Sequence, residues 1–438
     1  MWRAREIESE ISAGGSSQIP FAFQRLLRLR GVNLEAASHF LNPRISDLRD
    51  PYLMTNMKKA IDRLCLAFER GEKVAVYGDF DLDGTSGLAL LYQGLTSLGF
   101  KNVGRYQPKR LSEGYGLHYG GLKDLSEQGY SLVVTVDVGI TAIKTCELAK
   151  DLPLEVIITD HHLPEETLPA AFAVVNPNQN DDTSGLGYLC GAGVGFYLLR
   201  ALKRGFMERG WVEEANRCDL KEALEFFTIA TLTDMVPLVE DNRALVKMGL
   251  QKLSQTNKPG LKQLLKELKM DQKLLTGQDV AIRFAPKLNA LSRMESEVLP
   301  IDLYLAATEQ EAIRLVEVVH RTNSNRVKFQ NDAFEEALLK ASEQTEWPFI
   351  FIASPKFHRG VVGIVASKLC ETFGKPSFVG SVDPDGLTVV GSARRPDESN
   401  LHLVELLHAA AEHFERSGGH AGAAGFEELA RFGGNSVR

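Results

Sequence analysis

The chain has 438 residues, 44% of them hydrophobic and 24% charged, a balance that excludes a disordered, collagen-like or disulfide-stapled protein. Its formal net charge of -7 disfavours a broadly basic surface, so any contact with nucleic acid must come from local basic clusters or bound cations. The cysteines form no CxxC pair, which argues against a structural zinc site and a secreted, cross-linked fold; they are Cys65, Cys146, Cys190, Cys218 and Cys370.

The N-terminal stretch MWRAREIESEISAGG is charged and lacks the apolar core of a signal peptide. No apolar run in the sequence is long enough to cross a bilayer. Together with the cysteine pattern, these features predict a cytoplasmic protein with no membrane partner.

Strand-like and helix-like patterns alternate in the first half of the chain, after a helical N-terminal stretch. Apolar, β-branched runs predict buried strands at residues 73–78, 102–107, 132–137, 155–160 and 172–176. Helical patterns fall at residues 86–98 and 142–150. This alternation predicts an α/β fold with a doubly wound, mostly parallel sheet.

The pattern from residue 191 to 340 is mainly helical, and residues 308–340 contain neither Pro nor Gly, which predicts one long helix. Thr308 and Glu311 have the spacing of a capping box at its start. Pro348–Ala353 opens a second strand-and-helix pattern. We therefore expect an N-terminal helical segment (1–48), an α/β domain (49–307), a connecting helix (308–342) and a smaller α/β domain (343–438).

Acidic and imidazole side chains follow three of the predicted strands. Because the carboxyl ends of parallel strands meet at one edge of a sheet, we expect these side chains to lie together. They are Asp79, Asp81 and Asp83 after the first strand, Asp137 after the third, and Asp160, His161 and His162 after the fourth. Asp234, in the later segment ATLTDMVP, is a further candidate.

Crowded carboxylates are costly unless cations neutralise them. A ligand set of carboxylate oxygens and imidazoles suits Mn²⁺ or Mg²⁺ better than zinc bound by thiolates. Two such ions could clamp a phosphate and lower the pKa of a bound water. The sequence therefore predicts a two-ion phosphoesterase centre.

Each motif alone has a simpler interpretation. Residues 79–83 could form a solvated turn, and they resemble the start of a calcium loop, although the twelfth position holds Leu90 instead of glutamate. Asp137 could cap a helix. His161 and His162 could be one capping and one packed histidine. The occurrence of all the motifs, in order, at strand ends favours the metal centre.

The segments GDFDLDG, VTVDVGI, TDHH and ATLTDMVPL resemble, in order, the four motifs of the DHH phosphoesterase superfamily, and specifically the bacterial RecJ exonucleases. The resemblance extends to further segments between roughly residues 20 and 426. These are FLNP, YQPKR, EGYGL, CGAGVG, PKLNA, HRGVVGIVAS and GGHAGAAGF.

The resemblance implies a 5′-to-3′ exonuclease that uses two Mn²⁺ or Mg²⁺ ions to hydrolyse single-stranded DNA in repair and recombination. By similarity, one ion would be held by Asp79, Asp81 and Asp137. The other would be held by Asp83, Asp137, His161 and Asp234. His162 would face the scissile phosphate, and Asp160 would orient a histidine.

Basic and glycine-rich segments in the second half fit a DNA-binding role. Gly418, Gly419 and His420 could form a phosphate cradle, although a simple glycine turn is the alternative. An apolar helix begins near Val361 and could present its N-terminus to an anion. The residues expected to bind DNA around it are His358, Arg359, Arg293, Arg394 and Arg395, the last two following a short strand at 391–393; solvated surface positions are the alternative.

The sequence departs from RecJ in two respects. RecJ chains carry an oligonucleotide-binding barrel after the GGHA-type segment, whereas this sequence ends shortly after Phe426. We expect weaker binding of the strand without such a barrel, because it would supply stacking platforms and a basic groove. Lys287 and Ser292 stand where the family has Arg and Gly, and lysine binds phosphate only as a point charge.

Two other functions remain open. Other DHH branches cleave short oligonucleotides, cyclic dinucleotides or pyrophosphate, although the EGYGL segment and the long helical connector favour RecJ. Some RecJ-like chains have lost their metal ligands and act as scaffolds; here every ligand is present, so this alternative reduces to a form with impaired DNA binding. The expected partners are single-stranded DNA and, by resemblance alone, a single-strand-binding protein or a helicase.

Overall fold

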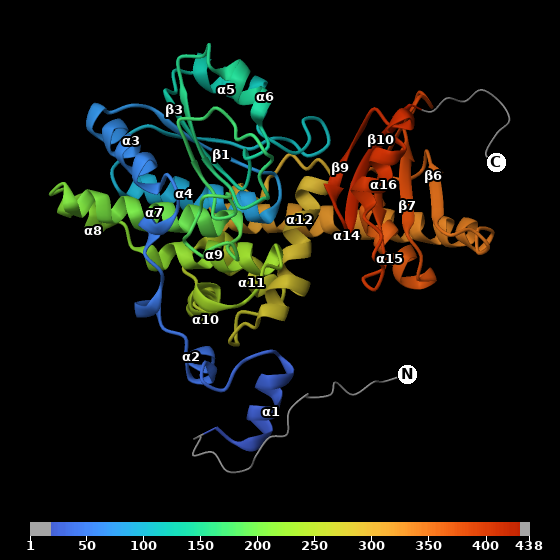
Figure 1. Cartoon of the computed structure of the whole chain (residues 1–438), viewed down its shortest axis with the longest axis horizontal. Coiled ribbons are helices and arrows are strands. Elements are labelled where there is room, and N and C mark those ends of the chain that lie inside the picture. The colour runs from blue at the N-terminus through green and yellow to red at the C-terminus, as the bar shows by residue number, and fades with distance from the viewer. Residues whose placement is uncertain (1–18, 430–438) are drawn as a thin grey trace. The chain divides into compact units, whose positions relative to one another are not determined.

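The computed structural model describes residues 19–429, which form two compact units (Figure 1). The first unit comprises the described residues up to Pro108 together with Tyr115–Ala285. The second comprises Lys109–Gly114 and the described residues from Pro286 onward. Among the described residues, no helix is long and apolar enough to cross a membrane.

The first unit is built on a five-stranded parallel sheet with the order β2-β1-β3-β4-β5. Its strands are β1 (Val74–Gly78), β2 (Val103–Tyr106), β3 (Leu132–Val136), β4 (Glu155–Thr159) and β5 (Ala173–Val175). All five predicted strands are confirmed, with small shifts at their ends. Because strand order reverses between β1 and β3, the crevice at the carboxyl ends of these two strands is the expected ligand position.

Helices cover both faces of this sheet, which confirms the doubly wound fold (Figure 1). On one face Leu122, Leu125 and Cys146 pack against alternate strand residues such as Ala75 and Val133. That face is covered by α5 (Tyr119–Glu127) and α6 (Ile143–Ala149). The other face is covered by α3 (Met57–Arg70), α4 (Leu82–Ser97) and α7 (Gly191–Glu208).

Two helices differ from the expectation. Helix α4 begins at Leu82, earlier than the predicted residue 86, because Asp81 accepts hydrogen bonds from the first backbone N–H groups and caps the helix. Helix α5 was not predicted, since its first turn contains Gly120 and Gly121, which are poor helix formers.

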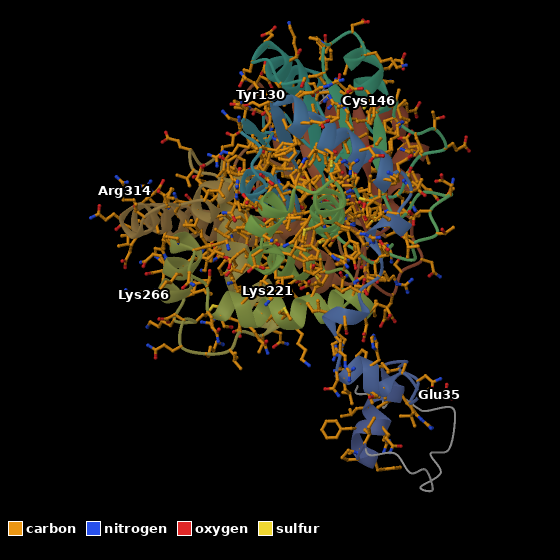
Figure 2. The ribbon with its side chains drawn as sticks, turned by 90° about the vertical axis from the view of Figure 1, so that its left-hand side faces the viewer. Glu35, Tyr130, Cys146, Lys221, Lys266 and Arg314 are labelled. Carbon is orange, nitrogen blue, oxygen red and sulfur yellow. The ribbon has the colours of Figure 1, made fainter. Side chains whose placement is uncertain are left out.

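Other described helices fall into an N-terminal group and a later group, and the later group confirms the mainly helical pattern after residue 191. The N-terminal ones are α1 (Phe21–Leu29) and α2 (Ala37–Leu41), with 3₁₀ turns at Ile45–Asp47 and Pro51–Leu53. The later ones are α8 (Val212–Arg217), α9 (Leu220–Thr233), α10 (Glu240–Ser254), α11 (Pro259–Glu267), a π-helical turn (Asp279–Phe284), α12 (Ala285–Arg293) and α13 (Pro300–Tyr304). Charged side chains such as Lys221, Lys266 and Arg314 extend from the helices into solvent (Figure 2).

The predicted long helix is confirmed as α14 (Glu309–Ser342). The hydroxyl of Thr308 accepts a hydrogen bond from the Glu311 N–H at 3.2 Å. The Glu311 carboxylate accepts from the N–H of Ala307 at 2.9 Å, one residue earlier than in a standard capping box.

The second unit contains a mixed sheet with the order β6-β7-β8-β10-β9. Strands β6 (Ile350–Ser354) and β7 (Ser377–Val382) are parallel, and β8 (Thr388–Arg394), β10 (Ala423–Leu429) and β9 (Arg416–His420) complete it in antiparallel fashion. Helices α14 and α15 (Val362–Phe373) share one apolar core with β6 and β7. A second core lies under α16 (Leu403–Ala409), which precedes a 3₁₀ turn at Ala411–His413.

Two local expectations for the second unit are corrected. Arg394 is the last residue of β8 and does not follow a shorter strand. Gly418, Gly419 and His420 lie on β9, which pairs with β10, so the glycine pair does not form an isolated turn.

Candidate metal centre

Asp79 and Asp81 lie at the junction of β1 and α4. Asp79 is buried, and a Cβ atom on Gly84 would lie 2.5 Å from its backbone nitrogen, so only glycine lets α4 start this close to the strand. The Oδ1 atom of Asp81 accepts from the N–H groups of Asp83 at 2.8 Å and Gly84 at 3.1 Å. This cap fixes the Asp81 carboxylate and leaves its second oxygen for a ligand.

Asp83 is buried against the N-terminus of α7. Its two oxygens accept from the backbone N–H groups of Gly191 at 2.7 Å and Ala192 at 2.8 Å. The positive end of the helix dipole stabilises a carboxylate at this position. This contact could not be predicted from the sequence, because the CGAGVG segment lies far from Asp83 in the chain.

Asp137 occupies the middle of the site, directly after β3. Its backbone has a φ of 64°, in the left-handed region that costs energy for a residue other than glycine. A Cβ atom on Gly191 would lie 2.4 Å from the Asp137 Cβ, so α7 reaches this aspartate only because residue 191 is glycine.

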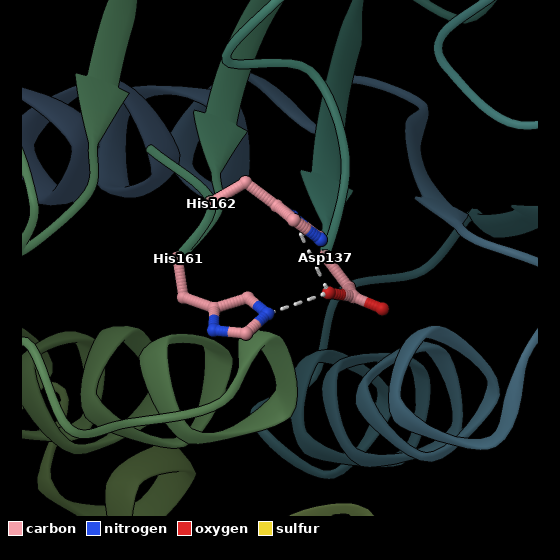
Figure 3. Close-up of side chains that lie close together, drawn as sticks. All are labelled: Asp137, His161 and His162. Carbon is pink, nitrogen blue, oxygen red and sulfur yellow. Dashed lines mark ion pairs between the residues drawn. The ribbon is translucent and has the colours of Figure 1, made fainter. Parts of the chain in front are cut away.

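The Oδ1 atom of Asp137 is buried and accepts no hydrogen bond from the described residues. It lies 3.3 Å from Nε2 of His161 and 3.9 Å from Nδ1 of His162 (Figure 3). Burial, followed by the negative charges of Asp83, Asp81 and Asp79, raises the pKa of Asp137 well above its ordinary value. A cation bound to this oxygen would remove both the unsatisfied acceptor and the repulsion.

His161 and Asp234 complete the other side of the cluster. Nε2 of His161 lies 3.8 Å from Oδ2 of Asp83 and 3.7 Å from Oδ2 of Asp234. Asp234 directly follows α9, and burial together with the charges of Asp83 and Asp81 raises its pKa to about 8. As at Asp137, a nearby cation would stabilise the ionised form of this carboxylate.

The structure brings all six expected metal ligands together in overlapping groups. Within each group the ligand atoms lie within 4.8 Å of one another; the groups are Asp79–Asp81–Asp137, Asp83–His161–Asp234 and Asp137–His161–His162. These donors are oxygens and imidazole nitrogens without a thiolate, a set that fits Mn²⁺ or Mg²⁺.

Asp160 is fully buried and holds His162. Its Oδ1 atom lies 2.7 Å from Nδ1 of His162 and also accepts from the backbone N–H groups of His161 and His162. Its Oδ2 atom accepts from the N–H of Ile140 at 2.9 Å. Burial lowers the pKa of His162, but the hydrogen bond and charge of Asp160 outweigh it and raise that pKa to about 9. The contact with Asp160 fixes the orientation of the His162 ring.

Several residues that support the site were not found from sequence. Gln107 donates to the backbone oxygen of Asp79 at 2.7 Å, and Asn176 donates to that of His162 at 2.9 Å. The hydroxyl of Tyr115 lies 3.3 Å from Nδ1 of His162. Gln107 and Tyr115 belong to the YQPKR and EGYGL segments, whose resemblance to RecJ was the available signal.

His358, Arg359 and Arg293 belong to the second unit. His358 is half-buried, which lowers its pKa, and its Nδ1 accepts from the N–H of Gly360 at 3.0 Å. Arg359 forms an ion pair with Asp383. Arg293 ends α12 and donates to the backbone oxygen of Gly360 at 3.4 Å.

The two adjacent arginines differ in their surroundings. Arg394 lies beside the first turn of α15, where a Cβ atom on Gly363 would be 3.3 Å from its Nη2 atom. Burial, together with the positive charge of Arg110, lowers its pKa. Arg395 instead donates to the backbone oxygens of Ala421 at 3.1 Å and Pro396 at 3.0 Å, so it braces the following loop.

The GGH segment runs along β9. Gly418 has open space where a Cβ would be, whereas a Cβ on Gly419 would lie 2.4 Å from the backbone oxygen of Ala423. Gly419 has a φ of 141°, so this position requires glycine. The backbone of His420 pairs with Ala423 in β10.

Comparison with known families and sequences gives consistent matches. Residues 73–231 match the DHH family, N-terminal domain, and residues 348–428 match the DHHA1 domain. The single-stranded-DNA-specific exonuclease RecJ of Bacillus subtilis is 35% identical over 402 residues, which cover 91% of this chain and 49% of the relative. The Escherichia coli RecJ is 33% identical over 435 residues, covering 97% and 74%. The chain thus spans about half the length of the first relative and about three quarters of the second.

Solved structures give the same result. The crystal structure of an exonuclease RecJ bound to manganese has a TM-score of 0.73 and 32% identity, covering 86% of this chain and 90% of that one. RecJ of Thermus thermophilus in complex with Mn²⁺ has a TM-score of 0.75 and 30% identity, covering 94% and 59%. The Mg²⁺ complex of that protein has a TM-score of 0.66.

Proposed function

The chain belongs to the RecJ family, which combines DHH and DHHA1 domains, and from that premise we propose that it is a metal-dependent exonuclease acting on single-stranded DNA. The reaction is phosphodiester hydrolysis, and the proposed direction is from the 5′ end. Because the chain spans about half the length of the Bacillus relative, activity, substrate and partners of the whole protein are all part of this proposal.

The observation that carries the proposal is the position of Asp137. Its buried Oδ1 atom accepts no hydrogen bond from the described residues and lies among carboxylates and imidazoles. The neighbouring negative charges raise the pKa of Asp137, and a bound cation would offset this repulsion. We assign Asp79, Asp81 and Asp137 to one ion. We assign Asp83, Asp137, His161 and Asp234 to the other, with Asp137 shared between the two. When bound, such ions neutralise the phosphate and lower the pKa of an attacking water.

The chain's own residues orient the reaction. Asp160 holds the Nδ1 side of His162, so that Nε2 faces the scissile phosphate. In the hydrolysis, the water loses one proton as its oxygen bonds to phosphorus, the bond from phosphorus to one bridging oxygen breaks, and the leaving oxygen takes up one proton. His162, whose pKa the hydrogen bond to Asp160 raises in the metal-free protein, is proposed to stabilise the negative charge that builds on the phosphate.

We assign binding of the DNA strand to the second unit. Arg394 beside the first turn of α15 offers a half-buried cation next to a helix N-terminus, which favours a phosphate. Arg293, His358, Arg359, Gly418, Gly419 and His420 are proposed to add contacts along the strand. Arg395 contributes mainly by bracing the loop next to Arg394. A single-strand-binding protein or a helicase is the proposed protein partner.

The cellular setting is proposed from the cysteines. All five are buried free thiols, which is consistent with a reducing compartment such as the cytoplasm.

End-labelled DNA tests the proposal. Purified protein is incubated with Mn²⁺ and single-stranded DNA labelled at either its 5′ or its 3′ end, beside the variant Asp137→Ala. Early release of labelled mononucleotide from the 5′-labelled strand by the parent alone would support the proposal. Turnover of dinucleotides without cleavage of the long strand would instead assign a short-substrate phosphodiesterase. Equal cleavage of single strands and blunt duplexes would refute the single-strand preference.

A further inference from the structure

Tyr115 lies beside His162 but has no role in the function proposed above. Its ring packs edge-on against Phe80, with centroids 6.5 Å apart, and against the His162 ring at 5.7 Å. These contacts fix the ring, although 48% of the residue is exposed to solvent. Its hydroxyl oxygen lies 3.3 Å from Nδ1 of His162.

The hydrogen on His162 Nδ1 is donated to Asp160. Asp160 Oδ1 is 2.7 Å from the same nitrogen, shorter than the distance to Tyr115. A ring nitrogen carries at most one hydrogen, and a carboxylate is a stronger acceptor than a phenol. Nδ1–H therefore donates to Asp160, and this nitrogen has no lone pair left to accept the hydrogen of Tyr115.

The Tyr115 hydroxyl thus keeps its own hydrogen for another acceptor. Within residues 19–429, the Tyr115 hydroxyl contacts no hydrogen-bonding group other than His162. The group is a neutral donor on a half-exposed ring, next to the histidine that faces the substrate. A phosphate in the metal centre would bring an oxygen acceptor to this position.

We propose that the Tyr115 hydroxyl donates a hydrogen bond to a non-bridging oxygen of the phosphate being hydrolysed. This inference rests on the proposed exonuclease function. Negative charge grows on the non-bridging oxygens as the bond to the leaving oxygen breaks, so the hydrogen bond is stronger in the transition state than in the bound substrate. Tyr115 therefore acts mainly on kcat.

The variant Tyr115→Phe removes the hydroxyl and keeps the ring that packs against Phe80 and His162. We expect kcat on single-stranded DNA to fall about tenfold while KM changes by less than about twofold. The matched control is Tyr119→Phe, which removes a hydroxyl from an exposed tyrosine at the start of α5 and should leave both constants unchanged. Thermal melting of both variants checks that they are folded.

Phosphorothioate substrates test the contact itself. Three DNA strands are compared in Mn²⁺: one with an ordinary terminal phosphodiester and one with each phosphorothioate diastereomer. Sulfur accepts hydrogen bonds weakly, so for one diastereomer the rate ratio of parent to Tyr115→Phe should shrink from about tenfold to below about threefold.

The outcomes separate this inference from the function on which it rests. A ratio that shrinks for one diastereomer supports the contact. A Tyr115→Phe variant with full activity, or one with the same loss on all three strands, overturns the contact while the exonuclease function stands. A parent protein that binds Mn²⁺ but cleaves none of the strands refutes the proposed function, and the role of Tyr115 with it.

Discussion

At the scale of single residues, the metal centre depends on contacts between side chains and backbone groups that lie far apart in the chain. The acids and histidines at the strand ends could be predicted as a cluster, because parallel strands bring their carboxyl ends together. The individual hydrogen-bond partners of these side chains could not be predicted. Asp83 accepts from the N-terminus of α7, and Tyr115 lies beside His162, and both contacts join residues far apart in the chain.

The variant Asp137→Asn tests whether the Asp137 carboxylate binds metal while destabilising the metal-free fold. Asparagine tolerates a positive φ and removes a buried charge, so metal-free protein should melt at the same temperature or higher. The rise in melting temperature on adding Mn²⁺ should shrink, and kcat should fall by about a thousandfold or more. Thermal melts with and without Mn²⁺ measure the first effect. Asp151→Asn, an exposed position, is the control, and an unchanged response to Mn²⁺ would contradict the assignment.

Asp160→Asn tests the origin of the charge on His162. Because Asp160 raises the pKa of His162 to about 9, the metal-free parent should hold a charged imidazole below that pH and lose the proton as pH rises through it. In the variant the midpoint should fall toward the ordinary histidine value near 6.5, and kcat should fall about tenfold to a hundredfold. NMR titration of the His162 ring gives the midpoint; one that stays near 9 would show that Asp160 is not the cause.

At the scale of elements, strands and the long helix followed from local patterns. The β-branched runs and the Pro- and Gly-free stretch after Thr308 each encode their structure locally. Helices that contain glycines for packing reasons were harder to predict. Helix α4 begins earlier than expected because Asp81 caps it and Gly84 allows it to pass close to Asp79. Helix α5 was not predicted because of its glycines.

The prediction at this scale concerns Gly191, the first residue of helix α7. A Cβ atom on residue 191 would lie 2.4 Å from the Cβ of Asp137 and would push the helix and the ligand apart. Gly191→Ala should lower the melting temperature and reduce activity at least about a hundredfold. Gly120→Ala is the matched control, since its Cβ would meet no atom within 4 Å and alanine favours the helix. Activity measurements that fail to distinguish these two variants would refute the close packing described above.

At the scale of the whole molecule, the acidic net charge is explained in part by the site. Asp79, Asp81, Asp83, Asp137 and Asp234 converge at one edge of the first sheet. The sequence predicted a doubly wound sheet and a smaller α/β unit, but not the strand order that puts β1 beside β3. It also gave no sign that Lys109–Gly114 belong with the second unit, because that association depends on tertiary contacts alone.

We propose that two cations share Asp137. Electron paramagnetic resonance of the protein titrated with Mn²⁺ tests it directly, because two ions held by one carboxylate are close enough to couple magnetically. We predict two bound ions per chain with an exchange-coupled signal, and a loss of coupling in Asp137→Asn. A single uncoupled Mn²⁺ at saturation, in a protein that still cleaves single-stranded DNA, would contradict the two-ion account.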